Sequence, residues 1–344
     1  MSMEEAKLNI RTNERPFLIE TKQYARRKMV DGLSEKIIAL LACVSASVIL
    51  FVFIFVFKEA MGVLSASGIG FVTKAGFDRQ IITAYSSPLD AKMWIFGVRG
   101  LILGTVTTTL GALLIAVPMG LGTAIVIAEL APTSIRKILQ VVVRLLASIP
   151  SVIYGLVGLM VVVPFIQHSL ITSAMQIHYI KRFQLSGNSM LAGILVLSIM
   201  IVPIIIALSV DAIKAVPDTY KKASLALGLS HWRTIIKVVL PAAKSGIFAG
   251  IILSIGRAIG EAIALSMVSG GIGNVPNIHD GPVLFLTPVL TLASAIVNKS
   301  EMMSVKSIES ALFACGLVLL LTSMVISLGA RLVEYLVKRG EGRV

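Results

Sequence analysis

Six apolar runs are the feature that most limits what this chain can fold into. Each meets or exceeds the roughly 20 residues that an α-helix needs to cross a ~30 Å hydrocarbon core. Only 14% of the 344 residues are charged, whereas soluble domains average about 25%. The sequence therefore predicts an all-α integral membrane protein with six transmembrane helices, at residues 37–57, 100–128, 138–166, 190–210, 245–268 and 308–328.

Lysine and arginine are unevenly distributed over the segments that connect the runs. They are concentrated before the first run, after the second and the fourth, and after the sixth. Because basic residues favour the cytoplasmic side of a membrane, this pattern predicts that both termini are cytoplasmic. The net charge of +13 is interpreted in the same way, as a determinant of topology and not as a sign of nucleic-acid binding.

The runs and the charges together predict how the chain is divided. No internal repeat of span pairs is visible, although many secondary transporters consist of two related halves in one chain. We therefore expect this chain to form one half of a larger assembly. The predicted parts are a cytoplasmic N-terminal segment (1–36), a first transmembrane helix (37–57), an external loop (58–99), a core with five transmembrane helices (100–338) and a cytoplasmic tail (339–344).

The segment between the fourth and fifth runs predicts two short helices, each with one apolar stripe. Gly228 is expected to end the first helix, Ser230 to cap the second, and Pro241 to turn the chain into the fifth span. A basic rim accompanies the stripes and consists of Lys221, Lys222, Arg233 and Lys237. Physical chemistry alone allows two interpretations: an amphipathic hairpin lying on anionic lipid, or a docking element for a cytoplasmic partner.

Two ionisable residues, Arg257 and Glu261, lie inside the fifth run. A helix over 245–268 would be about 36 Å long, and Arg257 would lie near its middle, too far from either interface to snorkel. A charge at that depth costs roughly 2.5–3.5 kcal/mol or more. The i,i+4 spacing predicts that the two side chains share one helix face and neutralise each other. The pair is either a brace that fixes helix packing or the lining of an anion pathway, since a planar guanidinium suits phosphate oxygens.

Arg144 lies near the start of the third run. Its side chain can snorkel to the cytoplasmic surface, and the alternative is a second cation beside the anion pathway. The sequence has no G-x4-G-K-[ST] phosphate loop and no metal-ligand spacing of Cys and His. We therefore expect no enzyme activity, no catalytic residue, no metal site and no bound cofactor in this chain.

The segment between the fourth and fifth runs also resembles the EAA loop of binding-protein-dependent ABC importer permeases, written E-A-A-x3-G-x9-I-x-L-P. The Gly-to-Leu-Pro spacing matches, while lysine replaces the glutamate and serine replaces the second alanine. The residues at the motif positions are Lys222, Ala223, Ser224, Gly228, Leu240 and Pro241. Two further stretches, "LLASIPSVIYGLVGLMVVVP" and "GRAIGEAIALSMVSG", are similar to phosphate permeases of the PstC type.

The resemblance implies the type I ABC importer permease fold and ATP-driven import of inorganic phosphate across a prokaryotic plasma (inner) membrane. It implies that the 216–241 loop docks on a dimer of ATP-binding cassette subunits, which hold ATP and Mg²⁺. It also implies a second, paralogous permease subunit and a soluble or lipid-anchored phosphate-binding protein. The candidate pathway residues are Arg257, Glu261 and Arg144. The sequence leaves open a permease for another oxyanion, such as sulfate or molybdate, and a stand-alone channel or secondary transporter.

Overall fold

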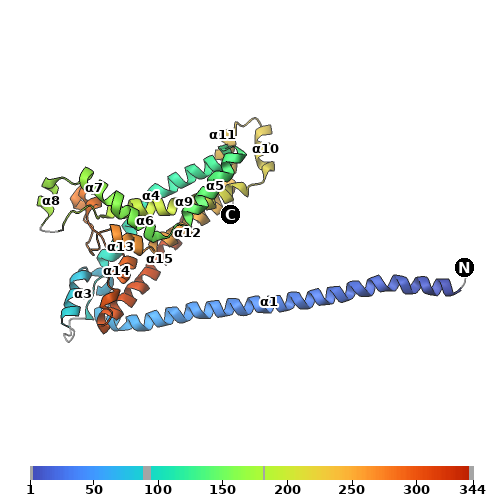
Figure 1. Cartoon of the computed structure of the whole chain (residues 1–344), viewed down its shortest axis with the longest axis horizontal. Helices are drawn as coiled ribbons and strands as arrows, with labels where there is room; N and C mark the ends of the chain where they lie inside the picture. Colours follow the sequence, from blue (N-terminus) through green and yellow to red (C-terminus); the bar gives the residue numbers. More distant parts are fainter. Residues whose placement is uncertain (1–2, 88–93, 181–182, 341–344) are drawn as a thin grey trace. The chain divides into compact units, whose positions relative to one another are not determined.

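A computed structural model describes residues 3–87, 94–180 and 183–340 of the chain (Figure 1). The chain divides into two units, residues 1–58 and 59–344. Helix α1 (Met3–Ser67) begins in the first unit, and its part that is long and apolar enough to cross a membrane is Leu33–Ser67. The predicted N-terminal segment and first span are thus one continuous helix. Residues 341–344 of the predicted tail lie outside the described residues.

Helices make up the regular structure of the described residues, apart from one isolated bridge between Gly270 and Val289. Six helical segments are long and apolar enough to cross a membrane, which confirms the predicted fold class. The first is in α1, and the other five are Arg99–Leu130, Ser151–Leu170, Met190–Lys214, His231–Ile259 and Lys306–Leu336. The second span consists of α4 (Arg99–Ile125) and the π-helical turn η2 (Val126–Leu130), and the third of α6 (Ser151–Val157), η3 (Gly158–Val162) and α7 (Val163–Leu170). The fourth is α9 (Met190–Lys214), and the fifth consists of α11 (His231–Thr234), η4 (Ile235–Val239) and α12 (Leu240–Ile259). The sixth lies in α15 (Lys306–Gly340).

Helix α9 is the most buried of the six spans and organises the second unit. It packs against α4 along one side and against α12 along another, as Figure 1 shows. Apolar side chains from these three helices, among them Ala116, Ile201 and Ile255, form one buried cluster. The shorter elements lie at the ends of this bundle: α2 (Gly70–Thr73), α3 (Phe77–Ser86), α8 (Ser173–Tyr179), α10 (Asp218–Ala226), α13 (Ile263–Val268), η5 (Ile278–Leu286), α14 (Leu292–Asn298) and η6 (Ser300–Met302).

The third predicted span is wrong in its first half. Residues before the break belong to a separate helix, α5 (Thr133–Ala147), and the span begins only at Ser151. Pro150 causes the break, because it has no N–H to donate and its extended conformation (ψ 139°) does not continue a helix. The Tyr154 hydroxyl donates a hydrogen bond to Leu146 O (2.9 Å), which also accepts one from the N–H of Ile149 (3.2 Å). The i+4 donor that Leu146 O would have in an unbroken helix is missing, because Pro150 has no N–H.

The fifth predicted span differs from the structure at both ends. No turn occurs at Pro241, because α11, η4 and α12 form one helix from His231 to Ile259. In η4 the N–H of Leu240 donates to Ile235 O, and this wider π-helical turn makes room for the proline ring. At the other end, α12 stops at Ile259, and the chain enters α13 only after a break at 260–262.

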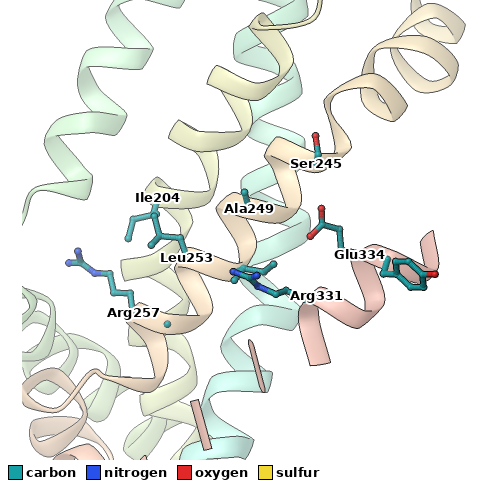
Figure 2. Close-up of a pocket in the computed structure, with 10 residues that line it drawn as sticks. Ile204, Ser245, Ala249, Leu253, Arg257, Arg331 and Glu334 are labelled. Atoms are coloured by element: carbon teal, nitrogen blue, oxygen red, sulfur yellow. The ribbon is translucent and has the colours of Figure 1, made fainter. Parts of the chain in front are cut away.

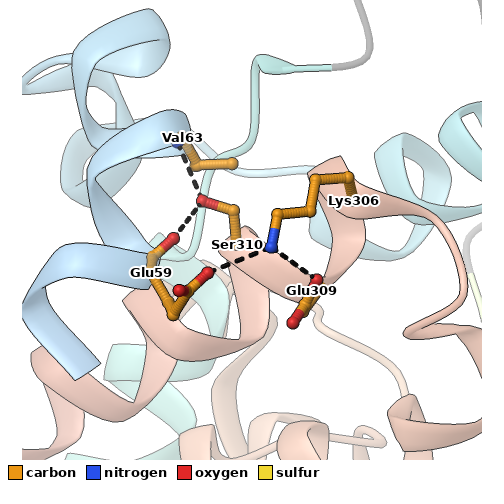
Figure 3. A network of polar contacts seen from close by, with 5 residues as sticks. All are labelled: Glu59, Val63, Lys306, Glu309 and Ser310. Atoms are coloured by element: carbon orange, nitrogen blue, oxygen red, sulfur yellow. Dashed lines mark hydrogen bonds and ion pairs between the residues drawn. The ribbon is translucent and has the colours of Figure 1, made fainter. Parts of the chain in front are cut away.

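The predicted external loop begins as helix and is tied to the start of α15 (Figure 3). Ser310 Oγ accepts a hydrogen bond from the N–H of Val63 (3.1 Å) and donates one to Glu59 O (2.7 Å). Lys306 Nζ lies 3.0 Å from a carboxylate oxygen of Glu59 and 3.0 Å from one of Glu309. This segment is therefore ordered by contacts with the sixth span, and its external location stays a prediction.

Gly120 and Gly122 provide a test of the packing between α4 and α9. A Cβ added to Gly120 would lie 2.7 Å from Ile205 Cγ2, whereas one added to Gly122 meets nothing within 4 Å. We expect Gly120→Ala to destabilise the protein by about 1–3 kcal/mol through overpacking. Gly122→Ala should be neutral or stabilise by up to about 1 kcal/mol, because alanine favours helix. Thermal unfolding in detergent measures both, and equal midpoints for the two variants would contradict the packing.

Candidate functional site

Arg257 lies in the last turn of α12 with an exposed side chain. The length argument that placed it at the middle of a span is wrong, because the helix ends two residues later. Backbone carbonyls at a helix C-terminus lack helical donors and carry partial negative charge. A guanidinium is therefore stabilised at this position, by about 0.3–1 kcal/mol, while its fork of donors still faces outward. The position suits a cation that meets a ligand.

A cavity of about 990 Å³ adjoins Arg257 and lies between α12, α9 and α15 (Figure 2). Half of the α12 lining residues have small side chains, and α15 contributes polar groups. In Figure 2 the Arg257 side chain extends away from Arg331 and Glu334, which lie on the α15 side. The lining residues are Ile204, Ser245, Ala249, Ile252, Leu253, Gly256, Arg257, Arg331, Glu334 and Tyr335.

Glu261 lies in the break between α12 and α13, and only 8% of it is exposed. Its Oε1 accepts a hydrogen bond from the N–H of Ala264 (3.0 Å) in the first turn of α13. The predicted i,i+4 pairing with Arg257 is therefore wrong. Gly260 ends the helix between the two residues, and the carboxylate instead satisfies a donor that the start of α13 leaves unpaired. The structure thus separates the two ionisable groups into an exposed cation and a buried cap.

Arg144 lies on α5, outside the spans found in the structure, so its predicted place inside the third span is wrong. Its Nη2 is 3.8 Å from Oδ1 of Asp211, which lies in the last turn of α9. The two side chains are 69% and 58% exposed, and an ion pair in such a setting contributes about 0–1 kcal/mol. The structure does not bring Arg144 together with Arg257 and Glu261 into one site, and its pathway role stays a prediction.

The two predicted helices are present as α10 and α11: α10 lies between the fourth and fifth spans, and α11 is the first turn of the fifth span. Gly228 has a left-handed φ of 81° and ends the first helix as predicted. Ser230 Oγ accepts a hydrogen bond from Arg233 N–H (3.4 Å) and caps the second helix as predicted. The side chain of Ser224, which replaces an alanine of the EAA pattern, is 3.0 Å from Thr234 Oγ1. This buried hydrogen bond joins α10 to α11, so the substitution adds a contact.

Large apolar side chains are exposed on these two helices. The prediction of two apolar stripes is only partly right, because Ile235 and Val239 are buried in the bundle. The others project from the segment, and Leu227 is 84% exposed at its tip. Lys222 and Ala223 are also exposed. We call this set the coupling surface, and it consists of Tyr220, Lys222, Ala223, Leu225, Leu227, Trp232 and Ile236.

Sequence reasoning missed one ion pair at the base of this segment. Lys221 Nζ lies 2.7 Å from Oε1 of Glu129, at the end of the second span. The side chains are 23% and 6% exposed, so both partners are largely removed from solvent. The sequence places Lys221 in the basic rim and does not indicate this partner. The one available signal is Glu129 itself, an isolated carboxylate at the end of a long apolar run that needs a cation nearby.

Comparison with known proteins identifies the family. Residues 116–339 match the family described as "Binding-protein-dependent transport system inner membrane component". This chain belongs to that family. The matched range contains both the coupling surface and Arg257, and the membership confirms the resemblance that the sequence motifs predict.

Individual relatives of this permease family cover most of the chain. A probable ABC transporter permease protein, YqgH of Bacillus subtilis, is 37% identical over 71% of this chain and 72% of its own length. The phosphate transport system permease protein PstC 1 of Mycobacterium bovis is 32% identical over 79% and 83%. PstC of Pasteurella multocida is 36% identical over 70% and 76%.

A solved structure supports the permease fold independently. A chain of a bacterial alginate ABC transporter, crystallised with an alginate pentasaccharide-bound periplasmic protein, matches with a TM-score of 0.50. The match covers 85% of this chain and 92% of that chain at 17% identity. At this identity the similarity concerns the fold alone, and it agrees with the six spans of the permease.

The different environments of Glu261 and Arg257 predict different effects on stability. Glu261→Ala should lower the free energy of unfolding by about 0.5–2 kcal/mol, the usual effect of losing a helix cap. Glu261→Gln keeps an acceptor oxygen and should lose less. Arg257→Ala should change stability by less than about 0.5 kcal/mol, as for other exposed positions. Thermal unfolding in detergent measures the stability of both variants. If Arg257→Ala loses as much stability as Glu261→Ala, the result would support the Arg257–Glu261 ion pair that the structure lacks.

Proposed function

We propose that this chain is one of two permease subunits of an ATP-driven importer of inorganic phosphate. The proposal is carried by the similarity to phosphate transport system permeases over most of the chain. No observation favours sulfate, molybdate or a stand-alone channel over phosphate import. The chain supplies half of the translocation pathway, and a second, paralogous permease subunit supplies the other half.

The exposed face of α12 supports the need for a second subunit. Arg257 is exposed near the end of a helix long enough to cross a membrane, and lipid packed against this face would place hydrocarbon beside its charge. Beside it, Ser245, Ala249 and Gly256 present little side-chain volume, and small residues allow another helix to approach closely. A paralogous subunit on this face would enclose an aqueous route with the guanidinium in its wall.

Arg257 and Glu261 have separate roles in this pathway. The guanidinium of Arg257 offers two parallel donors to the oxygens of a phosphate ion. Glu261, one turn further along the chain, holds the start of α13 and thereby the break beside Arg257. Should the carboxylate be released from Ala264 during transport, it can accept a hydrogen bond from a protonated phosphate oxygen, which sulfate lacks at neutral pH. Arg144 provides a further cation for anions at the surface.

The distribution of basic residues gives the proposed orientation of the chain in the membrane. We place α10 and α11 in the cytoplasm, with both termini, because basic residues are concentrated on that side. The predicted docking residues there are Lys222, Ala223, Ser224, Gly228, Leu240 and Pro241. A dimer of ATP-binding cassette subunits, with bound ATP and Mg²⁺, would cover the exposed Leu227 and Trp232 in the manner of a helix in a groove. A soluble or lipid-anchored phosphate-binding protein would deliver the anion at the opposite end, in a prokaryotic plasma (inner) membrane.

The proposal is tested on the complex purified through this chain. Co-purification of an ATPase subunit and a second permease is expected, whereas a chain that transports alone would be a channel or secondary transporter. Binding of phosphate and of sulfate to the partner binding protein then decides the substrate. Selective phosphate binding supports the proposal, and selective binding of sulfate or molybdate overturns it.

Substitution of Arg257 should affect transport more than stability. In proteoliposomes containing the complete transporter, Arg257→Gln should reduce phosphate uptake about 10- to 100-fold, because a charged hydrogen bond contributes about 1.5–3 kcal/mol. Arg257→Lys keeps the charge but not the planar fork, and should retain intermediate uptake. Glu261→Gln should reduce the preference for phosphate over sulfate. If these variants transport phosphate at the wild-type rate and with the wild-type preference over sulfate, Arg257 and Glu261 do not belong to the pathway.

Leu227 tests the docking role of the coupling surface. Leu227→Asp places a charge at a site that should be buried against the ATPase, and loss of a central apolar contact of this kind costs about 2 kcal/mol or more. We expect association with the ATPase subunit to weaken at least about tenfold. Ile177→Asp is the matched control, because Ile177 is 73% exposed but lies on α8, at the other end of the bundle. Equal ATPase recovery with both variants would contradict docking at Leu227.

A further inference from the structure

The ion pair between Lys221 and Glu129 connects α10, which carries part of the coupling surface, to the second transmembrane span. Lys221 is in the middle of α10, and Glu129 is in η2, the last turn of the second span. Their charged atoms are 2.7 Å apart, and the Glu129 side chain is only 6% exposed. The two groups of a short, largely buried ion pair adopt a narrower range of distances and orientations than those of two exposed and mobile side chains.

Glu129 depends on this partner more than an ordinary surface carboxylate does. It lies at the C-terminal end of a helix, where the partial negative charge of the last carbonyls opposes a carboxylate. Arg136, which follows on α5, donates instead to Ala131 O (3.0 Å). Lys221 in turn is 3.9 Å from Asp218, whose side chain is 79% exposed. Lys221 and Glu129 are therefore each other's principal charged partner in the part of the chain that the structure describes.

Helix α10 is attached to the fifth span as well. Ser224, one turn after Lys221, hydrogen-bonds to Thr234 of α11. From there the helix continues without interruption through η4 and α12 to Ile259. A force on the coupling surface therefore has two routes into the membrane. One runs through Ser224 and the continuous helix to Arg257, and the other runs through Lys221 and Glu129 to α4.

We propose that the Lys221–Glu129 pair transmits the displacement of α10 to the second span, so that α4 moves together with α12. This inference rests on the proposed function, since it assumes an ATPase that displaces α10. Because α9 packs against both α4 and α12, movement of α12 alone would shear this packing. The pair makes both neighbours of α9 follow the same displacement. Lys221 and Glu129 are positioning residues, and neither is expected to contact the anion.

The test measures phosphate transported per ATP hydrolysed by the complete transporter in proteoliposomes. Glu129→Gln and Lys221→Met should lower this ratio about tenfold, and the double variant should lower it no further, because the two residues act as one contact. The exchanged pair, Glu129→Lys with Lys221→Glu, should restore most of the ratio. Glu309→Gln is the matched control, because it removes an ion pair with Lys306 at the opposite end of the bundle and should leave the ratio unchanged.

Each result bears on one proposal. Unchanged ratios in both single variants, or an additive loss in the double variant, overturn the transmission role. If the neutral variants assemble poorly, Glu129→Asp decides, since it keeps the charge but shortens the link by one methylene: a lowered ratio supports the role and a wild-type ratio overturns it. A wild-type complex that carries another anion overturns only the phosphate proposal, and the ratio is then measured with that anion.

Discussion

The absence of water in the hydrocarbon core is the constraint on which the rest of this structure depends. Every backbone N–H and C=O within it needs a partner from the chain itself, so each departure from a straight helix must be compensated locally. Three departures here show such compensation. The π-helical turn η4 accommodates Pro241, Tyr154 donates to a carbonyl at the end of α5, and Glu261 accepts from the first turn of α13. Nearby groups therefore supply hydrogen-bond partners where these helices are interrupted, and Arg257 lies beside one such interruption.

The six spans could be predicted from the sequence because their signal is composition over a long window, and no packing detail alters it. The ends of the helices could not be predicted equally well. A pattern of apolar residues continues across Pro150 and across Gly260, whereas the helix stops at both. At Gly260 the outcome depends on which backbone donor the Glu261 carboxylate reaches, and this competition is decided by three-dimensional packing.

The same difference separates the local from the distant contacts of the candidate site. Gly228 and Ser230 act within their own turn, so their roles could be inferred from spacing alone. The partner of Lys221 is far away in the sequence, and no periodicity connects it to Glu129. The pairing of Arg257 with Glu261 was predicted from an i,i+4 spacing that holds only in an unbroken helix. Spacing rules therefore predicted contacts within a single turn, and they failed where they assumed a continuous helix that is in fact broken.

Continuity of one helix joins the coupling surface to the candidate anion site. From His231 to Arg257 the helix rises by about 39 Å, and no break interrupts it. A rigid rod of that length converts a tilt of about 5° at one end into a displacement of about 3 Å at the other, comparable to the helix shifts seen in other switching proteins. In the proposed complex, an ATPase docked on the coupling surface would therefore have to move α11 only slightly to move Arg257 by the length of a hydrogen bond. The helix ends at Ile259, and beyond this break the Glu261 carboxylate keeps the Ala264 N–H paired at the start of α13.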